Sequence, residues 1–210
     1  ALDDAFEQLV GSDTATASPD HGHSVHVDAG GLDPATDYFY RFRVGEFTSP
    51  VGRTRTLPAP DSSPEQVRLA IANCQYFESG YYAAYRYIAE DEVDLVVHLG
   101  DYIYELPALG GERSSAPTES PTTLAAYRLR YSSYKVDEDL QAAHASAPFT
   151  LTWDDHEVAD NYMGDTLPSG APADEVRRLR AAAYQAWWEN LPVRLDPPDG
   201  PDLVVYHDVT

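Results

Sequence analysis

The sequence predicts two structural parts: an N-terminal region of short β-strands forming part of a β-sandwich, and a C-terminal α/β region with a largely parallel sheet. Up to residue 57, short runs alternate apolar and polar residues, which is typical of half-buried strands. From residue 65 onwards, short apolar runs alternate with segments of helical spacing, which is typical of βαβ units. Between them, the Pro- and Ser-rich segment 58–64 predicts a stiff, polar linker that separates a domain at 1–57 from one at 65–210.

The composition predicts a folded chain that binds neither nucleic acid nor a membrane. Hydrophobic residues make up 43% of the 210 residues, which is too many for a disordered chain. Asp and Glu total 35 against 14 Lys and Arg, so the net charge is −21, and the Lys/Arg stripes that phosphate backbones require are missing. No apolar run approaches the roughly 18 residues of a membrane span. With Cys74 as the single cysteine, an intrachain disulfide is excluded.

The acidic bias has two interpretations, which the sequence leaves open. Lys135 is the single lysine, beside 13 arginines. One interpretation is adaptation to strong brine, where a Debye length of about 3 Å at 1 M salt screens the self-repulsion of an acidic surface. The other is a GC-rich genome, which encodes Arg in place of Lys.

In the N-terminal part, turn residues separate the expected strands. Strands are expected over 24–27, 38–44 and 52–56, with Gly, Asp and Pro forming turns at 30–34. This is too few strands for a closed sandwich of about seven. We therefore expect the chain to begin inside this domain.

In the C-terminal part, a strand, a helix and a second apolar strand follow each other within about 35 residues, which predicts a βαβ unit. A Pro/Gly/Ser loop is expected over 106–121. Strands are expected over 67–72, 93–99, 149–153 and 203–209, and helices over 81–91, 120–134 and 174–190.

Polar clusters follow three of these strands at their C-terminal ends. The clusters are Asn73-Cys74, Gly100-Asp101 and the acidic run 154–157. Because ligands of open α/β sheets bind at that edge, these distant segments are expected to converge.

The first two clusters offer ligands for a strongly acidic metal ion. Asp101 and Tyr104 could place a carboxylate and a phenolate on one ion, and Cys74 could add a thiolate that the metal deprotonates. For each residue a purely structural role remains an alternative: Asp101 as a turn cap, Tyr104 as a buried ring and Cys74 as a small buried hydrophobe.

The third cluster surrounds a histidine with acids. Asp154, Asp155 and Glu157 raise one another's pKa unless a cation holds them, and Asn161 offers a neutral carbonyl oxygen. His156 is a candidate proton donor or phosphate-facing charge. A solvated acidic turn is the alternative.

Together these motifs resemble one family. They are the Gly100-Asp101 pair with Tyr104, the W-D-D-H-E run at 153–157 followed by Asn161, the N-C-Q run at 73–75, the G-Y-Y run at 80–82, and the helix at 184–191 with its Trp pair. They are similar to the motifs of PhoD-type alkaline phosphatases in the metallophosphoesterase superfamily. Segments 31–34, 38–42 and 49–56 resemble the fibronectin-like (type III) domain that precedes the catalytic domain in that family, so the resemblance covers nearly the whole chain.

The resemblance implies a site of two or more metal ions, iron (Fe3+) and calcium, that hydrolyses small phosphate mono- and diesters with a metal-activated water. By position, Cys74, Asp101 and Tyr104 would hold the ferric ion, with Asp101 bridging, and Asn161 would serve the second site. Either Asp154 or Asp155 would be the acidic ligand of that second site. His156 matches the catalytic histidine. The resemblance also implies a secreted, extracytoplasmic protein, and we expect a monomer.

The sequence departs from the superfamily pattern at the C-terminal metal ligands, which in the superfamily typically include a His-x-His pair. After Asn161 the sequence contains one histidine, His207. We therefore expect a catalytic domain cut short, with weak metal binding and little activity. The alternative function is a non-catalytic extracellular interaction module with a degenerate α/β domain. A separate metal site at His21, His23 and His26 is a minor alternative, because a loop leading into an exposed strand explains this spacing as well.

Overall fold

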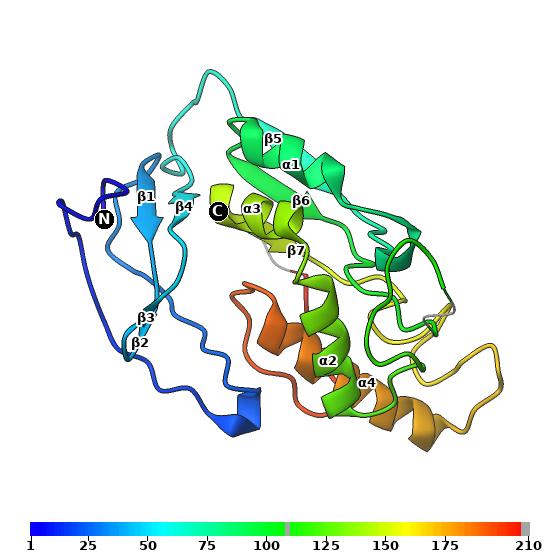
Figure 1. The fold of residues 1–210 in the computed structure, drawn as a ribbon. Coiled ribbons are helices and arrows are strands. Elements are labelled where there is room, and N and C mark those ends of the chain that lie inside the picture. Colours follow the sequence, from blue (N-terminus) through cyan, green and yellow to red (C-terminus); the bar gives the residue numbers. More distant parts are fainter. Residues whose placement is uncertain (108–109, 207–210) are drawn as a thin grey trace.

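The computed structural model describes residues 1–107 and 110–206, and Figure 1 shows their arrangement. A small region of antiparallel strands lies beside a larger α/β region that contains all four α-helices. The strands are β1 Asp37–Tyr40, β2 Arg43–Val44, β3 Phe47–Thr48, β4 Gly52–Arg55, β5 Leu69–Ala72, β6 Leu95–His98 and β7 Phe149–Leu151. The helices are α1 Ala83–Glu90, α2 Leu124–Tyr134, α3 Glu138–Ser146 and α4 Ala173–Asn190, with 3-10 turns at Pro19–His21 and Phe77–Ser79.

The α/β region is built on a parallel sheet, as the sequence predicts. Its strand order is β5-β6-β7, and both pairs are parallel. Helix α1 forms the crossover from β5 to β6, while α2 and α3 form the crossover from β6 to β7. All three strands therefore point the same way, and the loops that follow them lie at one edge of the sheet.

Helix α3 is an element that the sequence analysis did not predict. It begins at a standard N-cap, because the Asp137 side chain accepts a hydrogen bond from the backbone N–H of Leu140. Glu138 and Asp139 place acids in its first turn, where the helix dipole favours them. Only two turns long, α3 has a weak apolar period, with Leu140 and Ala143 as its buried residues.

The core beneath the sheet edge is rich in aromatic rings. α2 packs against α4, and α1 packs against α3. Tyr127, Tyr131 and Tyr134 of α2 and Trp187 of α4 are inaccessible to solvent, as is Tyr102 in the loop after β6. Burying rings of this size stabilises the fold by several kcal/mol. It also makes the loop after β6 part of the core.

The N-terminal region contains two small antiparallel sheets. β1 pairs with β4 and β2 pairs with β3, so the strand predicted over 38–44 is divided in two. The strand predicted over 24–27 is wrong: this segment has no ladder partner, and Val25 and Val27 are exposed. The fibronectin-like sandwich stays a prediction.

The C-terminal strand predicted over 203–209 is wrong for its described part. Residues 203–206 form no strand, and the rest of this prediction, with His207, lies outside the described residues. The remaining predicted strands and helices of the α/β region are present, with ends shifted by at most four residues.

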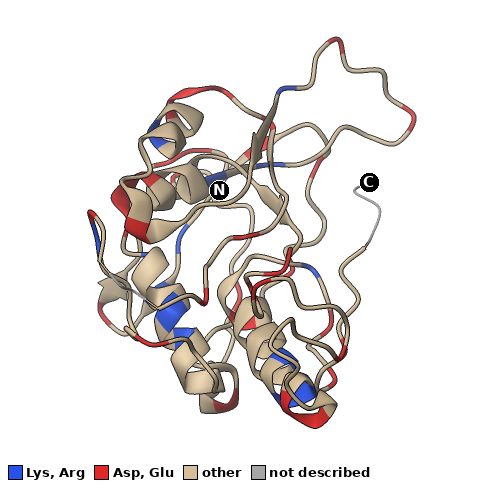
Figure 2. Cartoon of the chain, turned by 90° about the vertical axis from the view of Figure 1, so that its right-hand side faces the viewer, with Lys and Arg blue, Asp and Glu red and all other residues tan. Residues whose placement is uncertain are grey.

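Figure 2 shows Asp and Glu positions spread over loops and several helices, whereas Lys and Arg occur at fewer, scattered positions. Within residues 1–107 and 110–206, no helix combines the length and apolar character that a membrane span requires.

Candidate metal centre

The predicted convergence of the strand ends is present in the structure. Beyond β5 and β6, Cys74 N donates to Gly100 O (3.2 Å) and Gln75 N donates to Asp101 O (3.1 Å). Cys74 and Asp101 then turn with φ of 53° and 56°, in the left-handed region that non-glycine residues rarely adopt. These turns direct the chain away from the sheet just where the candidate ligands lie.

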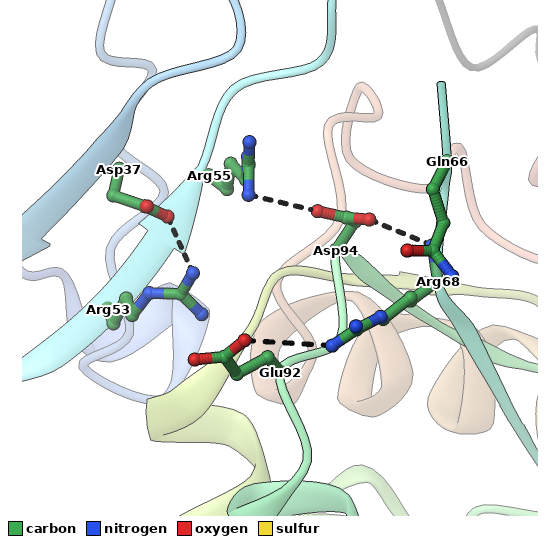
Figure 3. A pocket seen from close by; sticks show the side chains of 7 residues that line it. All are labelled: Asp37, Arg53, Arg55, Gln66, Arg68, Glu92 and Asp94. Carbon is green, nitrogen blue, oxygen red and sulfur yellow. Dashed lines mark hydrogen bonds and ion pairs between the residues drawn. The ribbon is translucent and has the colours of Figure 1, made fainter. Parts of the chain in front are cut away.

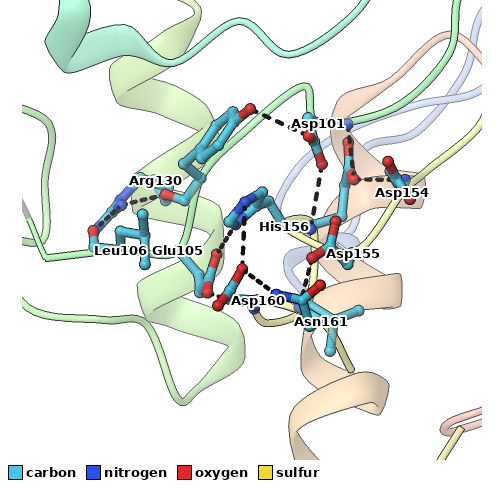
Figure 4. A network of polar contacts seen from close by, with 12 residues as sticks. Asp101, Glu105, Leu106, Arg130, Asp154, Asp155, His156, Asp160 and Asn161 are labelled. Carbon is cyan, nitrogen blue, oxygen red and sulfur yellow. Dashed lines mark hydrogen bonds and ion pairs between the residues drawn. The ribbon is translucent and has the colours of Figure 1, made fainter. Parts of the chain in front are cut away.

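Asp101 is the centre of the first ligand group. Its buried carboxylate accepts hydrogen bonds at Oδ2 from Cys74 Sγ (3.3 Å) and Tyr104 Oη (3.1 Å). At Oδ1 it accepts from the backbone N–H of His156, 3.3 Å away and in the loop after β7 (Figure 4). One carboxylate therefore contacts the loops that follow all three strands.

The loop after β7 provides the second group. Ligand atoms of Asp101, Asp155 and His156 lie within 4.8 Å of one another, a spacing that suits one metal ion. Oδ2 of Asp155 also accepts from the backbone N–H of Asn161 at 2.5 Å. Asn161 turns with a φ of 56°, and its side-chain amide donates to Asp160 (Figure 4).

Of the two neighbouring aspartates, Asp155 belongs to this three-residue group and Asp154 does not. Asp154 is exposed, and it lines an open hollow of about 290 Å³ together with Trp153, Asp155, Tyr162 and Gly164. Partial burial and the negative charges of Asp101 and Asp155 raise the pKa of Asp154. Its carboxylate is thus near the group, on the side that faces solvent.

His156 is held between a carboxylate and an aromatic ring. Its Nδ1 donates to Oε2 of Glu105 at 2.8 Å, and its ring stacks on Tyr104 with centroids 4.1 Å apart. Oε1 of Glu105 accepts from the backbone N–H of Asp160 at 2.7 Å. Burial alone would lower the pKa of His156, but the hydrogen bond to Glu105 and the surrounding carboxylates raise it to about 9. The imidazole is therefore a cation at neutral pH in the metal-free state.

The thiol and the phenol are protonated in this state. Burial and the hydrogen bond to Asp101 raise the pKa of Cys74. Burial, followed by the negative charge of Asp101, also raises the pKa of Tyr104. Both groups donate to Asp101 Oδ2, and each would have to release its proton to bind a metal ion.

Three further residues position the site, and none of them was predicted as a ligand or as a catalytic residue. Glu157 accepts backbone hydrogen bonds from both ligand loops, and Glu105 orients His156. Arg130 is fully buried in α2 and donates to the carbonyl oxygens of Tyr104, Leu106, Pro117 and Glu119. Glu157 was visible within the acidic run, but sequence alone does not distinguish a ligand from a group that binds backbone amides.

The other predicted cluster does not form a metal site in the described part of the chain. His21, His23 and His26 are not within ligand distance of one another as a group of three. Instead His26 stacks on Trp188 with centroids 4.1 Å apart, and its ring nitrogens contact the carbonyl oxygens of Val193 and Trp188. These contacts attach the N-terminal segment to the end of α4.

Comparison with known proteins identifies relatives of both parts of the chain. Residues 69–210 match the family model of the PhoD-like phosphatase, and residues 1–58 match that of the PhoD-like phosphatase N-terminal domain. The chain is 44% identical to alkaline phosphatase D of Bacillus subtilis (strain 168) over 217 residues, which is 100% of this chain and 37% of that protein. A solved structure described as the structure of PhoD superposes with a TM-score of 0.97 at 44% identity, covering 100% of this chain and 41% of that one.

This chain thus spans about two fifths of the length of these relatives. The matched region includes all three ligand loops and the strands that place them. The chain belongs to the PhoD-like phosphatase family.

Proposed function

We propose that the loops after β5, β6 and β7 form part of a metal-dependent phosphoesterase site that hydrolyses small phosphate mono- and diesters. The observation that supports this most strongly is the Asp101 carboxylate, which contacts a thiol, a phenol and the His156 loop at distances of 3.1–3.3 Å. Family membership and the relative named alkaline phosphatase D support the same reaction class.

The donor atoms fit the two kinds of ion that the family resemblance implies. The carboxylate and phenolate oxygens suit a hard trivalent ion such as Fe3+, which suppresses the pKa of its acidic ligands, and a Cys thiolate is a softer donor that iron also accepts. The Asp155 carboxylate and the Asn161 side-chain carbonyl are oxygen ligands of the type that Ca2+ prefers. Cys74, Asp101 and Tyr104 would hold the first ion, and Asp155 and Asn161 would contribute to the second. When bound, such ions polarise phosphoryl oxygens and lower the pKa of a water molecule.

Within the chain, His156 would supply the proton that the reaction needs. His156 is protonated at neutral pH in the metal-free state, so its imidazolium can donate a proton to the departing oxygen of a phosphate ester. Glu105 fixes the ring through Nδ1, which leaves Nε2 as the atom available for that transfer. Asp160 Oδ1 lies 3.8 Å from Nε2, on an exposed side chain that can move aside.

Long-range charge opposes the binding of an anionic ester. The net charge of −21 should repel phosphate esters, and the imidazolium of His156 is surrounded by carboxylates. Bound metal ions are therefore needed to reverse the local potential before such a substrate can approach. This requirement connects the proposed substrate class to the proposed ions.

Metal content and hydrolysis, measured together, test the proposal. The wild-type chain, Asp101→Asn, Cys74→Ala and the control Asp139→Asn would be loaded with Fe3+ and Ca2+, dialysed and measured by elemental analysis and with bis(p-nitrophenyl) phosphate. Asp139 of α3 pairs with Arg86 of α1 and is not one of the candidate ligands, so its replacement should change neither quantity. We expect Asp101→Asn and Cys74→Ala to lose iron. Equal iron in all four proteins would refute the ligand assignment.

A further inference from the structure

A fully buried carboxyl group connects the two loops that carry Asp101 and Asp155 through backbone amides. Oε1 of Glu157 accepts from the N–H of Tyr102 at 2.6 Å. Oε2 accepts from the N–H of Asp101 at 3.1 Å and from the N–H of Asp154 at 2.9 Å. All three bonds to the backbone therefore come from residues at or beside the candidate ligands.

The connection between the loops runs in both directions. Glu157, in the loop after β7, binds the backbone of Asp101, and the side chain of Asp101 binds the backbone of His156 in the loop after β7. The two segments also touch directly at Gly100, where a Cβ atom would lie 2.7 Å from Cβ of Asp154. The spacing between the carboxylates of Asp101 and Asp155 is thus set by backbone contacts that do not involve a metal ion.

We propose that Glu157 is a positioning residue that fixes the distance between Asp101 and Asp155 and thereby the affinity for the metal ions. This inference rests on the proposed metal centre. Glu157 is not itself a ligand, because its two oxygens are directed at three backbone N–H groups. Its role is to hold the two loops at one separation before an ion binds, so that binding need not order them.

A purely local role is the competing explanation. The bond to Asp154 spans three residues within one turn, and a carboxylate there stabilises the turn in the manner of a helix N-cap. If Glu157 only stabilised this turn, its replacement would change the folding free energy but not the affinity of the folded protein for metal ions. The bonds to Asp101 and Tyr102, which span 56 and 55 residues, predict an effect on affinity as well.

Two variants of Glu157 and one control separate these roles. In Glu157→Gln an amide NH2 replaces one oxygen, so at least one backbone N–H faces another donor. Glu157→Asp keeps the carboxyl group but is one methylene too short to reach both loops. The control is Glu189→Gln: Glu189 is also buried, but it pairs with Arg128 and contacts no candidate ligand.

The measurement is a calorimetric titration with Ca2+ alone, at a temperature where each variant is folded. We expect both Glu157 variants to bind about 10–100-fold more weakly than wild type, the range known for outer-shell partners of metal ligands, and Glu189→Gln to bind as wild type. Hydrogen exchange at the Asp101 and Tyr102 amides should also become faster in both Glu157 variants. If one Glu157 variant does not fold, the Ca2+ affinity of the other variant tests the proposal.

The two proposals fail in different ways. Wild-type affinity in a folded Glu157 variant would overturn the positioning role and leave the metal centre intact. Absence of Ca2+ binding to the wild-type chain would overturn the metal centre and this inference together. An equal loss of affinity in Glu189→Gln would show that any buried carboxylate has the same effect, which also overturns the positioning role.

Discussion

At the scale of single residues, the candidate ligands lie in unfavourable backbone conformations. Cys74, Asp101 and Asn161 all have φ between 53° and 56°, in the left-handed region. Each such residue costs on the order of 1 kcal/mol relative to an extended or helical conformation, and residues of this kind concentrate at functional sites. The surrounding hydrogen bonds offset this cost and hold the three side chains in place.

Gly100 is the residue whose replacement should separate the two loops. Its φ of 108° disfavours any side chain, and an added Cβ would overlap the backbone of Asp154. Gly100→Ala should therefore destabilise the protein by about 3 kcal/mol or more, and thermal unfolding measures this. The control is Gly170→Ala, where φ is 76° but an added Cβ would meet no atom within 4 Å. This variant should therefore lose only about 1 kcal/mol of stability. Equal losses in both variants would contradict the close approach of the loops.

His144 makes stability depend on pH. Burial, with smaller contributions from Lys135 and His98, lowers its pKa from 6.5 to about 3, and its Nε2 forms a hydrogen bond with the hydroxyl of Tyr102. Below pH 6.5 the unfolded chain binds a proton that the folded protein excludes, so stability falls as pH falls towards 3. Between pH 7 and 5 the loss from His144 is about 2 kcal/mol.

Urea unfolding of wild type and His144→Gln at pH 7 and pH 5 would measure this loss. His98, whose pKa burial lowers to about 4, adds a loss of the same sign in both proteins. We therefore expect the pH dependence of the Gln variant to be smaller than that of wild type, but not zero. The same slope in both proteins would show that His144 is not the responsible group.

At the scale of elements, the sequence correctly predicts the strands and helices that have a long apolar run or a strong hydrophobic period. The runs around β5, β6 and β7 and the long amphipathic α4 are where they were expected, because buried strands and helices of this length have unambiguous patterns. Since parallel strands end at one edge, the approach of Cys74 to Asp101 followed from the strand assignment.

Elements and site residues that depend on tertiary contacts could not be predicted in this way. The two-turn α3 has a clear cap at Asp137, but only two buried residues to define a period. Segment 24–27 alternates like a strand, yet His26 packs on Trp188 and no strand pairs with it. Glu105 and Glu157 contact backbone amides more than 50 residues away, and residue type does not encode such partners.

Arg130 should control the order of the loop that connects Tyr104 to α2. Its guanidinium binds four carbonyl oxygens between Tyr104 and Glu119 from within α2. In Arg130→Lys the charge is kept, but a single ammonium group cannot reach four divergent acceptors. We expect a stability loss of about 2–4 kcal/mol and faster hydrogen exchange in this loop. In the control Arg178→Lys, on α4, neither quantity should change. Unchanged exchange in Arg130→Lys would show that the loop is held by other contacts.

At the scale of the whole molecule, an ion pair joins the N-terminal strands to the parallel sheet. A hollow of about 280 Å³ lies between them, and its lining consists of Asp37, Arg53, Arg55, Gln66, Arg68, Glu92 and Asp94 (Figure 3). Arg55 of β4 pairs with Asp94, just before β6, at 3.2 Å. The three arginines are balanced by three acids, so this surface is close to neutral in a chain of net charge −21.

Added salt acts on this molecule in two opposite ways, and their magnitudes decide the result. It weakens partly exposed ion pairs such as Arg55–Asp94, each of which is worth about 0–1 kcal/mol. It also screens the mutual repulsion of 21 excess negative charges, which destabilises the compact state at low salt. Because the repulsion involves the whole surface and each exposed ion pair contributes little to stability, screening should dominate.

We therefore expect the melting temperature to rise by roughly 4–8 °C between 20 mM and 1 M NaCl, which corresponds to about 2 kcal/mol. Scanning calorimetry in NaCl and in KCl measures this, and the same rise in both salts would exclude a site specific for one cation. The variant Arg55→Gln lacks one ion pair and has one more net negative charge. Its melting temperature should be lower than that of wild type at 20 mM salt and should approach the wild-type value at 1 M, because salt weakens the ion pair and screens the added charge. A melting temperature that falls with salt would mean that ion pairs, and not repulsion, dominate the electrostatics of the fold.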